Sequence, residues 1–505
     1  MKRKVFIAIF VLLIPAAALR AQSAPADSLS AKDTVVLTLE QALQIALSEN
    51  ISVKVADREI ERAGYARKGS YASLFPQVDG MGSFQRTIKK QIMYMDGDGF
   101  DFSSMIGESL AAYLMPLYAQ HPGLTPPAPS TPDDSSSSSS NDGFAVGRWN
   151  TWSAGVSASM PLVNAQLWKS LKISDQDVEL AVEKARSSRL ETVTQVKQAY
   201  FGVLMAKQAF EVYKSVYENA LENAEQVEKK HKSQRASELD LTRARTTLAN
   251  AIPNVYDAEN AVMLSLWQLK AVMGMDLETP IDVAGSLDDY AEHMFYDINE
   301  TASAGLENNS TLRQLALQAE QLANTVRLQQ YASLPSLSLG FSYSMNAMAN
   351  DFKFSEYQWS PYSYVGISLS IPIFAGGKRA NAVRQARVQA AELDLQRINT
   401  ERQLKISIRQ NLNTMETSMK SYGSARSAVE SAEKAYAIAS KSYDVGRSTL
   451  TDLNDAQLAL TQARLSVCQA VYNFVVAKAN LEGTLGADFI DGDGTVNLNK
   501  TYGNE

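Results

Sequence analysis

Four segments of the chain alternate between apolar residues and small polar residues, which is the pattern of a β-strand with two unlike faces. The alternation is clear at 152–160, 337–345 and 365–371, whereas 78–87 alternates poorly and is assigned mainly through the internal repeat described below. Segments of about ten alternating residues with aromatic side chains are typical of transmembrane barrel strands. On alternation alone, half of a soluble β-sandwich would be the commoner explanation.

Long stretches without an internal proline or glycine separate these segments and predict long helices. They lie between Pro161 and Gly202, at 203–252, at 378–422 and at 447–482. A helix of about 60 residues would be about 90 Å long, far beyond an ordinary globular helix. We expect tight turns at 233–235 and 445–447.

The last helix of each half carries a heptad seam, in which apolar residues step alternately by three and four positions. Alanine takes every second place in this seam, so a neighbouring helix can approach closely. The two seams are Leu241, Ala244, Leu248, Ala251, Val255, Ala258 and Val262, and Leu453, Ala456, Leu460, Ala463, Val467, Ala470, Phe474, Ala477 and Leu481. Pro253 lies within the first of these helices, off the seam, and is expected to kink the helix or free one carbonyl. An ordinary dimeric coiled coil is the alternative interpretation.

The two halves of the chain carry matching residues in the same order, which indicates an internal duplication. The matches pair Leu47–Asn50 and Pro76 with Leu306–Asn309 and Pro335, Gly155–Pro161 with Gly366–Pro372, and Asp240, Leu241 and Gly274 with Asp452, Leu453 and Gly486. The first two matches are farther apart in the first half than in the second, so an insertion lies between Pro76 and Pro161. The stretch 90–148 is rich in proline and contains the run Ser135–Ser140. This composition predicts a flexible loop.

The chain begins with a secretory signal peptide pattern at 1–21. Three basic residues precede a ten-residue apolar run at 5–14, which is too short to span a bilayer, and small residues follow. Cleavage there would leave Gln22 first, and the only cysteine is Cys468, so we expect no lipoprotein anchor. We also expect no transmembrane helix. The mature chain is then divided into a first repeat (22–276), a linker (277–300), a second repeat (301–488) and a flexible tail (489–505).

Composition excludes several classes of function. One cysteine and three scattered histidines among 505 residues argue against a disulfide framework and against a cysteine- or histidine-ligated metal centre. A net charge of −7 gives no support to nucleic-acid binding. No catalytic motif is present, so we expect no enzymatic activity, no cofactor and no metal. Cys468, between seam residues, is expected to be a buried, inert thiol.

With these features the chain resembles the TolC-like family of outer-membrane efflux proteins. The resemblance is carried by the order, spacing and duplication of its motifs rather than by any one of them. The motifs are Leu37-Thr-Leu-Glu-Gln-Ala-Leu43 with Asn50, Leu74-Phe-Pro76, Ile371-Pro-Ile-Phe-Ala-Gly-Gly377, and Tyr443-Asp-Val-Gly446 leading into Asp452 and Asp455.

The resemblance implies a mixed α/β membrane protein that works as a homotrimer. Each chain would give four strands to a shared transmembrane β-barrel of 12 strands, continued by a long α-helical barrel across the periplasm. The implied function is the outer-membrane exit duct of a tripartite efflux or type I secretion system in a Gram-negative bacterium. Its partners would be outer-membrane lipid, a periplasmic adaptor and an inner-membrane transporter. The alternative is a trimeric, surface-anchored coiled-coil protein with a structural or adhesive role, and the substrate is left open between drug, metal and protein.

The resemblance also assigns candidate sites. Asp452 and Asp455 match acidic residues near the periplasmic mouth of the duct, and Tyr443 and Asp240 match positions that tie helices together there. Without the resemblance, a solvated helix face would be the ordinary reading of the two aspartates. The adaptor-docking candidates are Val445, Gly446 and Arg447 at one helical tip and Gln234 and Arg235 at the other. The second tip lacks the glycine that favours a tight turn, so its docking is expected to differ. Four prolines are expected at the joints of the barrel: Pro76, Pro161, Pro335 and Pro372.

Overall fold

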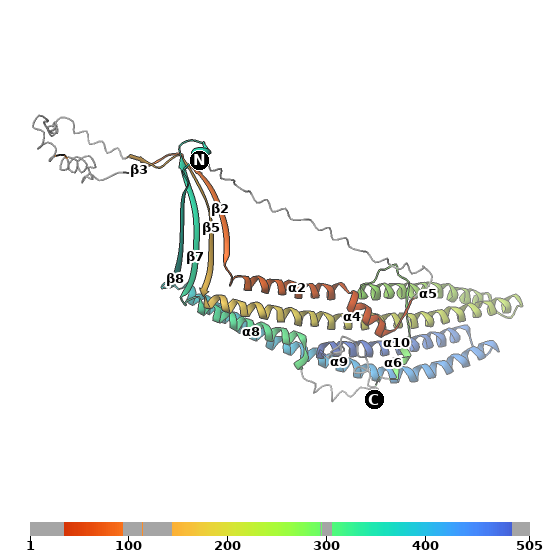
Figure 1. Ribbon diagram of the computed structural model, residues 1–505. Coiled ribbons are helices and arrows are strands. Elements are labelled where there is room, and N and C mark those ends of the chain that lie inside the picture. The colour runs from red at the N-terminus through yellow and green to blue at the C-terminus, as the bar shows by residue number, and fades with distance from the viewer. Residues whose placement is uncertain (1–34, 94–113, 115–143, 293, 295–305, 487–505) are drawn as a thin grey trace, which may run out of the picture. The chain divides into compact units, whose positions relative to one another are not determined.

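The structure is a computed structural model that describes residues 35–93, 114, 144–292, 294 and 306–486 (Figure 1). The expected signal peptide at 1–21, most of the expected loop at 90–148 and the expected tail at 489–505 lie outside these residues. The described residues fall into two compact units. The helical unit contains residues up to Ala63, Val178–Ala319 and residues from Ala391 onward, and the sheet unit contains Gly64–Asp177 and Glu320–Ala390.

Both units draw residues from both halves of the chain. The elements of the first half are β1 (Val35–Leu37), α1 (Leu39–Glu49), α2 (Ile51–Ala72), β2 (Gln77–Arg86), β3 (Gln91–Met93), β4 (Phe144–Val146), β5 (Asn150–Val163), α4 (Ala165–Lys232) and α5 (Glu238–Met273). The following elements are β6 (Ile281–Val283), α6 (Leu287–Ala291), η1 (Leu306–Asn308), α8 (Ser310–Tyr331), β7 (Ser336–Ala349), η2 (Phe354–Glu356), β8 (Ser360–Ser370), α9 (Lys378–Asp444) and α10 (Leu450–Leu485).

The sheet unit is built on an antiparallel sheet in the order β2-β5-β7-β8, so all four predicted strands are confirmed. Residues paired directly across strands point to the same face of a sheet. Val156 pairs with Gly80 and Tyr343, and Phe341 pairs with Ala158 and Val365. The register therefore gathers most apolar residues of the four strands on one face and most serines on the other. Met81 of β2 and Tyr362 and Tyr364 of β8 are exceptions that lie on the serine face.

The apolar face of this sheet is open within the described structure. Val365, Ile367 and Leu369 of β8 are 70%, 67% and 60% exposed, and Val78 of β2 is 66% exposed. On the opposite face the small polar residues meet one another, as in the 2.6 Å hydrogen bond between the hydroxyls of Ser83 and Ser153. A soluble sandwich would cover such an apolar face with a second sheet.

The four candidate joint prolines lie at or near the ends of the strands. Pro76 and Pro335 directly precede β2 and β7, and Pro372 follows β8, where its carbonyl accepts a 2.7 Å hydrogen bond from the Arg379 guanidinium. Pro161 lies inside β5, at a shift in its register with β7. Its missing N–H is tolerated there because β2 begins opposite Ser159 and no longer pairs with β5 at this point.

The two longest helices are longer than the stretches that are free of glycine and proline. α4 and α9 have 68 and 67 residues and run through Gly202 and Gly423, where a single glycine costs only about 1 kcal/mol. α5 is continuous through Pro253. No helix among the described residues has an apolar stretch long enough to cross a bilayer.

The predicted seams face inward. Ala244, Ala251 and Ala258 of α5 are buried, as are Leu453, Leu460, Ala463, Ala470, Phe474, Ala477 and Leu481 of α10. Cys468 is also buried, and burial raises the pKa of its thiol to about 11, which keeps it in the unreactive protonated form.

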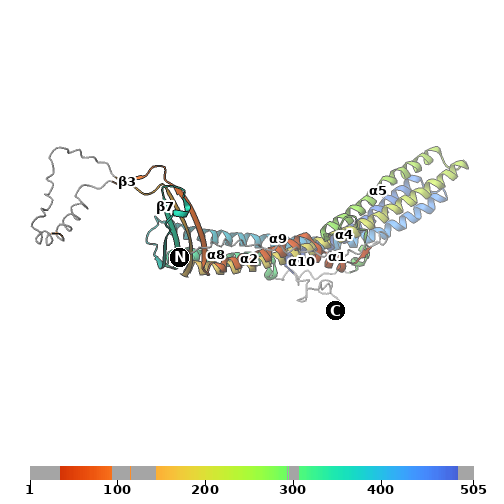
Figure 2. The same cartoon turned by 45° about the horizontal axis from the view of Figure 1, so that its top comes forward.

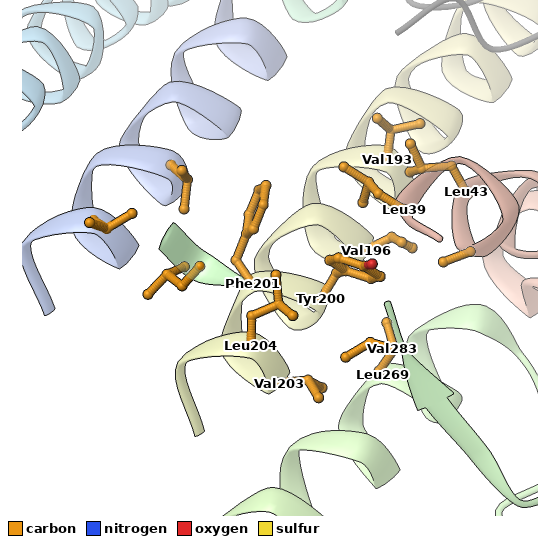
Figure 3. Packing of buried hydrophobic residues seen from close by; sticks show 14 of the residues in the cluster. Leu39, Leu43, Val193, Val196, Tyr200, Phe201, Val203, Leu204, Leu269 and Val283 are labelled. Atoms are coloured by element: carbon orange, nitrogen blue, oxygen red, sulfur yellow. The ribbon is translucent and has the colours of Figure 1, made fainter. Parts of the chain in front are cut away.

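The main core of the helical unit surrounds Tyr200 and Phe201 on α4 (Figure 3). The Tyr200 hydroxyl donates to the carbonyl of Ala284 at 2.7 Å, and the Phe201 ring packs edge-on against Tyr290 at 5.0 Å. Here β1 pairs in parallel with β6, so part of the expected linker at 277–300 is built into the core. Tyr200 thus holds the start of the described chain and the linker against α4.

Asn50 and Asn309 make the same pair of contacts in the two halves. Each side-chain amide donates to a carbonyl at the end of a long helix, Asn50 to Val272 of α5 and Asn309 to Thr484 of α10, both at 2.6 Å. Each side-chain oxygen accepts backbone N–H groups at the start of the following helix. These two asparagines therefore connect the end of one helix to the beginning of another, in both halves.

Gly274 and Gly486 complete these two junctions. Both end their helix in the left-handed conformation, with φ of 75° and 66°. A Cβ at Gly274 would lie 2.6 Å from the Glu49 carbonyl oxygen, and one at Gly486 would lie 2.2 Å from that of Asn308. Only glycine fits both the backbone conformation and the close approach.

A buried ion pair joins α4 to α10. The Lys197 ammonium lies 2.9 Å from the Glu482 carboxylate, and the two side chains are only 2% and 12% exposed. Burial makes both charges costly, and their attraction offsets part of that cost. The sequence pattern gave no sign of this pair.

Candidate functional site

The candidate site lies at the ends of two helical hairpins, α4–α5 and α9–α10, which come together within the helical unit (Figure 2). A small apolar cluster joins them there. Its buried members come from α4, α5 and α10, and α9 contributes the half-buried Tyr436, Ala439 and Tyr443. The buried members are Ala224, Val227, Ala244, Leu450 and Leu453.

Both hairpins turn in the same way. Gln234 and Gly446 each adopt a left-handed backbone, with φ of 59° and 74°. The following residues, Arg235 and Arg447, donate their N–H to the carbonyls of Lys230 and Ser442, at 2.7 Å and 2.8 Å. The N–H groups of Gln234 and Gly446 donate to the carbonyls of His231 and Tyr443, at 2.8 Å and 3.0 Å. At each tip the two bonds together form a Schellman motif.

The tip at Gln234 lacks a glycine and nevertheless makes the same backbone turn as the tip at Gly446. That docking differs between the two tips stays a prediction. Gln234 is the single non-glycine residue with positive φ in the described part of the chain. The left-handed conformation costs a side-chain-bearing residue about 1–2 kcal/mol, which the hydrogen bonds of the turn offset. What differs between the tips is their side chains.

A capping box begins the helix after each turn. The hydroxyls of Ser237 and Thr449 donate to the carboxylates of Asp240 and Asp452, both at 2.7 Å. The aspartate N–H groups donate back to these hydroxyls at 3.0 Å and 3.2 Å. Two candidate gate residues therefore also hold the first turn of α5 and α10.

Hydrogen bonds from Thr449 lower the pKa of Asp452. The largest contribution comes from the Thr449 backbone N–H, at 2.8 Å from the carboxylate, and the next from the Thr449 hydroxyl. Both bonds favour the ionised carboxylate. Asp452 is consequently charged at neutral pH, and it lies exposed on α10, as does Asp455 one turn further along.

Lys230 connects the two hairpins. Its ammonium lies 4.7 Å from the centre of the Tyr443 ring and 3.4 Å from the Asp444 carboxylate. Burial raises the pKa of the Tyr443 phenol, and the Asp240 and Asp444 carboxylates raise it further. Tyr443 of α9 is therefore a neutral ring that offers a face to the Lys230 cation of α4.

The candidate docking residues are exposed. Val445 is 68% exposed, and Gly446, Arg447, Gln234 and Arg235 are also open to solvent. The end of α4 carries a group of basic residues, Lys229, Lys230, His231 and Lys232, in its last turn. The three lysines of this group lie at the carbonyl end of the helix, where positive charge is favourable.

Sequence reasoning missed two features of this site. It did not anticipate that Lys230 of α4 contacts Tyr443 and Asp444 of α9. It also assigned Asp240 and Asp452 to a gate without noting the Ser237-x-x-Asp240 and Thr449-x-x-Asp452 spacing, which is the signal of a capping box. No sequence signal places Lys230 opposite Tyr443, because the two residues are far apart in the chain.

Comparison with known proteins gives a family and a fold. The family model for outer membrane efflux proteins matches residues 131–275 and 302–487. The outer membrane protein TolC of Escherichia coli strain K12 is 21% identical over 346 residues, which cover 67% of this chain and 70% of TolC. The alkaline protease secretion protein AprF of Pseudomonas aeruginosa is 24% identical over 339 residues, covering 66% of this chain and 69% of AprF.

Among solved structures, the CmeC outer membrane channel of Campylobacter jejuni has a similar fold. The TM-score is 0.65 at 19% sequence identity, and the alignment covers 92% of this chain and 87% of CmeC. At this identity the likeness concerns the fold alone.

Proposed function

Because this chain belongs to the outer membrane efflux protein family, we propose that it is the exit duct of a tripartite efflux or type I secretion system. In this proposal the duct conducts passively, without a cofactor or catalytic residues. Substrates are handed over by an inner-membrane transporter through a periplasmic adaptor. The relatives described above support an outer-membrane efflux or secretion channel, and the partners and the passive mode of transport are our inference.

The observation that carries the proposal is the exposed apolar face of the β2-β5-β7-β8 sheet. All four strands contribute apolar residues to this face, and residues such as Val365 and Ile367 are more than half exposed. Such a face suits contact with lipid. An open sheet edge is not tolerated in a bilayer, so β2 of one copy must pair with β8 of the next. Three copies of the four-stranded sheet then close one barrel of 12 strands.

The two halves contribute to this duct as an internal duplication. The equivalent contacts of Asn50 and Asn309, and the equivalent close approaches of Gly274 and Gly486, support the duplication, since random resemblance would not preserve them in pairs. The units of the proposal are a first repeat at 22–276, a linker at 277–300 and a second repeat at 301–488. In the trimer, the long helices of both repeats continue the barrel into the periplasm.

The gate is proposed at the helical tips. Three copies would bring six carboxylates, from Asp452 and Asp455, to the mouth of the duct, where they attract cations and repel anions. Asp240 and Tyr443 lie where the two hairpins meet, and the Lys230–Tyr443 contact supports a role in holding them together. The exposed tip residues Val445, Gly446, Arg447, Gln234 and Arg235 are the proposed adaptor contacts.

The proposed location is the outer membrane of a Gram-negative bacterium, reached through a cleaved signal peptide at 1–21 and without a lipid anchor. A surface-anchored coiled-coil adhesin is not favoured, because its anchor would sit at one end of the chain. In this protein the strands of the sheet lie between helices in both halves.

Cell fractionation combined with gel migration of unboiled samples tests this function. We expect the protein in the outer-membrane fraction, migrating as a detergent-stable trimer that collapses to a monomer on boiling. A soluble monomer would overturn the proposal. A membrane-bound trimer that conducts no ions would support the membrane location but would contradict the proposal that the protein is a duct.

A further inference from the structure

A group of aromatic rings lies at one end of the apolar face of the sheet. Phe84 of β2 and Trp152 of β5 stack with ring centres 4.2 Å apart. The segment between β7 and β8 adds Phe352, 6.1 Å from Phe84, and Phe354, 4.6 Å from Trp152. Large rings at the end of an apolar sheet face are typical of the membrane–water boundary.

Hydrogen bonds hold the chain segments at this end in fixed positions. The Thr87 N–H donates to the Trp149 carbonyl at 2.8 Å, which joins the end of β2 to the start of β5. The Trp149 N–H donates to Asn350, and the Asn150 amide donates to the Asp351 carbonyl at 2.9 Å. The three segments therefore form one surface, which we call the aromatic rim (residues 84–90, 148–152 and 350–357).

Cations lie on the rings of this rim. The Arg86 guanidinium is 5.4 Å from the centre of the Phe352 ring, and the Lys90 ammonium is 4.9 Å from that of Trp149. Lys89, Arg148 and Lys353 add three more basic residues, against two acidic ones, Asp351 and Glu356. Among the described residues, Lys353 pairs with Glu356, whereas no ion pair holds Arg86 or Lys90. The aromatic rim is thus basic beside an apolar face.

We propose that Arg86 and Lys90 bind the phosphate groups of anionic lipid headgroups in the membrane that surrounds the sheet. The inference rests on the proposed function, because it requires the apolar face to contact lipid. Acyl chains would cover Val78, Val156 and Phe341, while the rings lie at headgroup level. The ring faces hold the two cations in place, and guanidinium and ammonium groups bind phosphate oxygens strongly when so positioned. A lipid rather than a soluble phosphate is the occupant, since the cations adjoin the apolar face.

The test uses the full-length protein in phosphatidylcholine nanodiscs that contain a small fraction of diphosphoryl lipid A. Native mass spectrometry counts the lipid A molecules that stay bound when the protein is released from the nanodisc. We expect the wild-type protein to retain diphosphoryl lipid A in preference to the same lipid without phosphates. Combining Arg86→Gln with Lys90→Gln should weaken this retention by about fivefold for each charge removed.

The matched control combines Lys405→Gln with Lys434→Gln, which removes two positive charges from α9, where each lysine pairs with a glutamate on its own helix. This control should retain lipid A as the wild type does. Equal retention of the phosphorylated and phosphate-free lipids by the wild-type protein would overturn the inference without any variant. Failure of the wild-type protein to enter nanodiscs at all would instead overturn the proposed function.

Discussion

Lys230 of α4 lies against Tyr443 of α9, with its ammonium 4.7 Å from the centre of the aromatic ring and 3.4 Å from the neighbouring Asp444 carboxylate. The two residues belong to different hairpins, so this contact bridges the α4–α5 and α9–α10 tips. The Lys230 side chain is 30% exposed and that of Asp444 is 50% exposed, which keeps the ion pair weak. The contact between the Lys230 ammonium and the Tyr443 ring adds to the stabilisation from the ion pair, because the ring is half-buried.

Removing this bridge should favour separation of the hairpins. We expect Lys230→Gln to weaken the closed arrangement by about 1 kcal/mol, which corresponds to an open population about fivefold higher. Single-channel recording in planar bilayers measures this population. Lys232→Gln is the matched control, because Lys232 pairs with Glu228 one turn earlier on α4. Equal open populations for Lys230→Gln and Lys232→Gln would show that the bridge has no role in closure.

The carboxylates of Asp452 and Asp455 should govern the passage of ions. Changing both to Ala is expected to raise single-channel conductance and to reduce cation selectivity. Asp452 also caps α10, so Thr449→Ala serves as the control: it removes the hydroxyl of the cap, at a cost of about 1 kcal/mol, and leaves both charges. If Thr449→Ala alone reproduces the loss of selectivity, the effect comes from the cap and not from the charges.

The stability of the first turn of α10, which the capping box at Asp452 holds, should fall at low pH. The pKa of Asp452 is lowered by the hydrogen bonds from Thr449, so the stabilisation is fully present above the ordinary aspartate pKa of about 4 and is lost as the pH falls through the lower, folded value. Hydrogen exchange at the first turn of α10, corrected for intrinsic rates, should show constant protection from pH 7 to about 5 and a decline below about 4. A decline already between pH 7 and 5 would contradict this account.

Much of the fold could be predicted from pattern, because two periodicities dominate it. The alternation at 337–345 and the heptad seam from Leu453 to Leu481 each extend over many residues, and both were confirmed. The weak strand at 78–87 was found only through the repeat, since Gly80, Gly82 and Asp79 blur its alternation. The parallel pair of β1 and β6 was not predicted, because three-residue strands carry too little periodicity to detect.

The site was less predictable than the fold. The turns and the exposed tip residues follow from local sequence, but the left-handed Gln234 does not, because its turn is held by backbone bonds that any residue can make. The contacts of Lys230 with Tyr443 and of Lys197 with Glu482 join residues from opposite halves of the chain. Such pairs depend on which helix faces which, and a single sequence gives no direct signal of that.

The junction at Gly486 should tolerate no side chain. We expect Gly486→Ala to lower the free energy of unfolding by more than about 1 kcal/mol, because the new Cβ would meet the Asn308 carbonyl and a left-handed backbone strains alanine. Gly202→Ala, inside α4 with open space around it, should instead stabilise by up to about 1 kcal/mol. Thermal unfolding in detergent compares the two variants. Equal shifts would mean that the close approach at Gly486 does not constrain the fold.

The two faces of β8 should respond differently to charge. Ile367→Lys places an ammonium on the apolar face and is expected to destabilise the membrane-inserted protein by up to about 2–4 kcal/mol. Ser368→Lys, on the opposite face, should leave the yield of heat-sensitive trimer in the outer membrane unchanged. Equal yields from both variants would mean that lipid does not cover the apolar face.

Adaptor binding should depend on the exposed tip of the α9–α10 hairpin. Arg447→Glu is expected to weaken co-purification with the adaptor, because it reverses a charge in the proposed contact, while trimer and barrel remain intact. Pull-down with a periplasmic adaptor that co-purifies with the wild-type protein measures the effect, and migration of the unboiled trimer reports assembly. Undiminished co-purification would remove Arg447 from the docking surface.

Conductance of the purified wild-type protein in a planar lipid bilayer tests the central claim most directly. If three copies close a barrel around a continuous duct, each insertion event should add one discrete, cation-selective conductance step of uniform size. Insertion of the trimer without any conductance step would contradict the account.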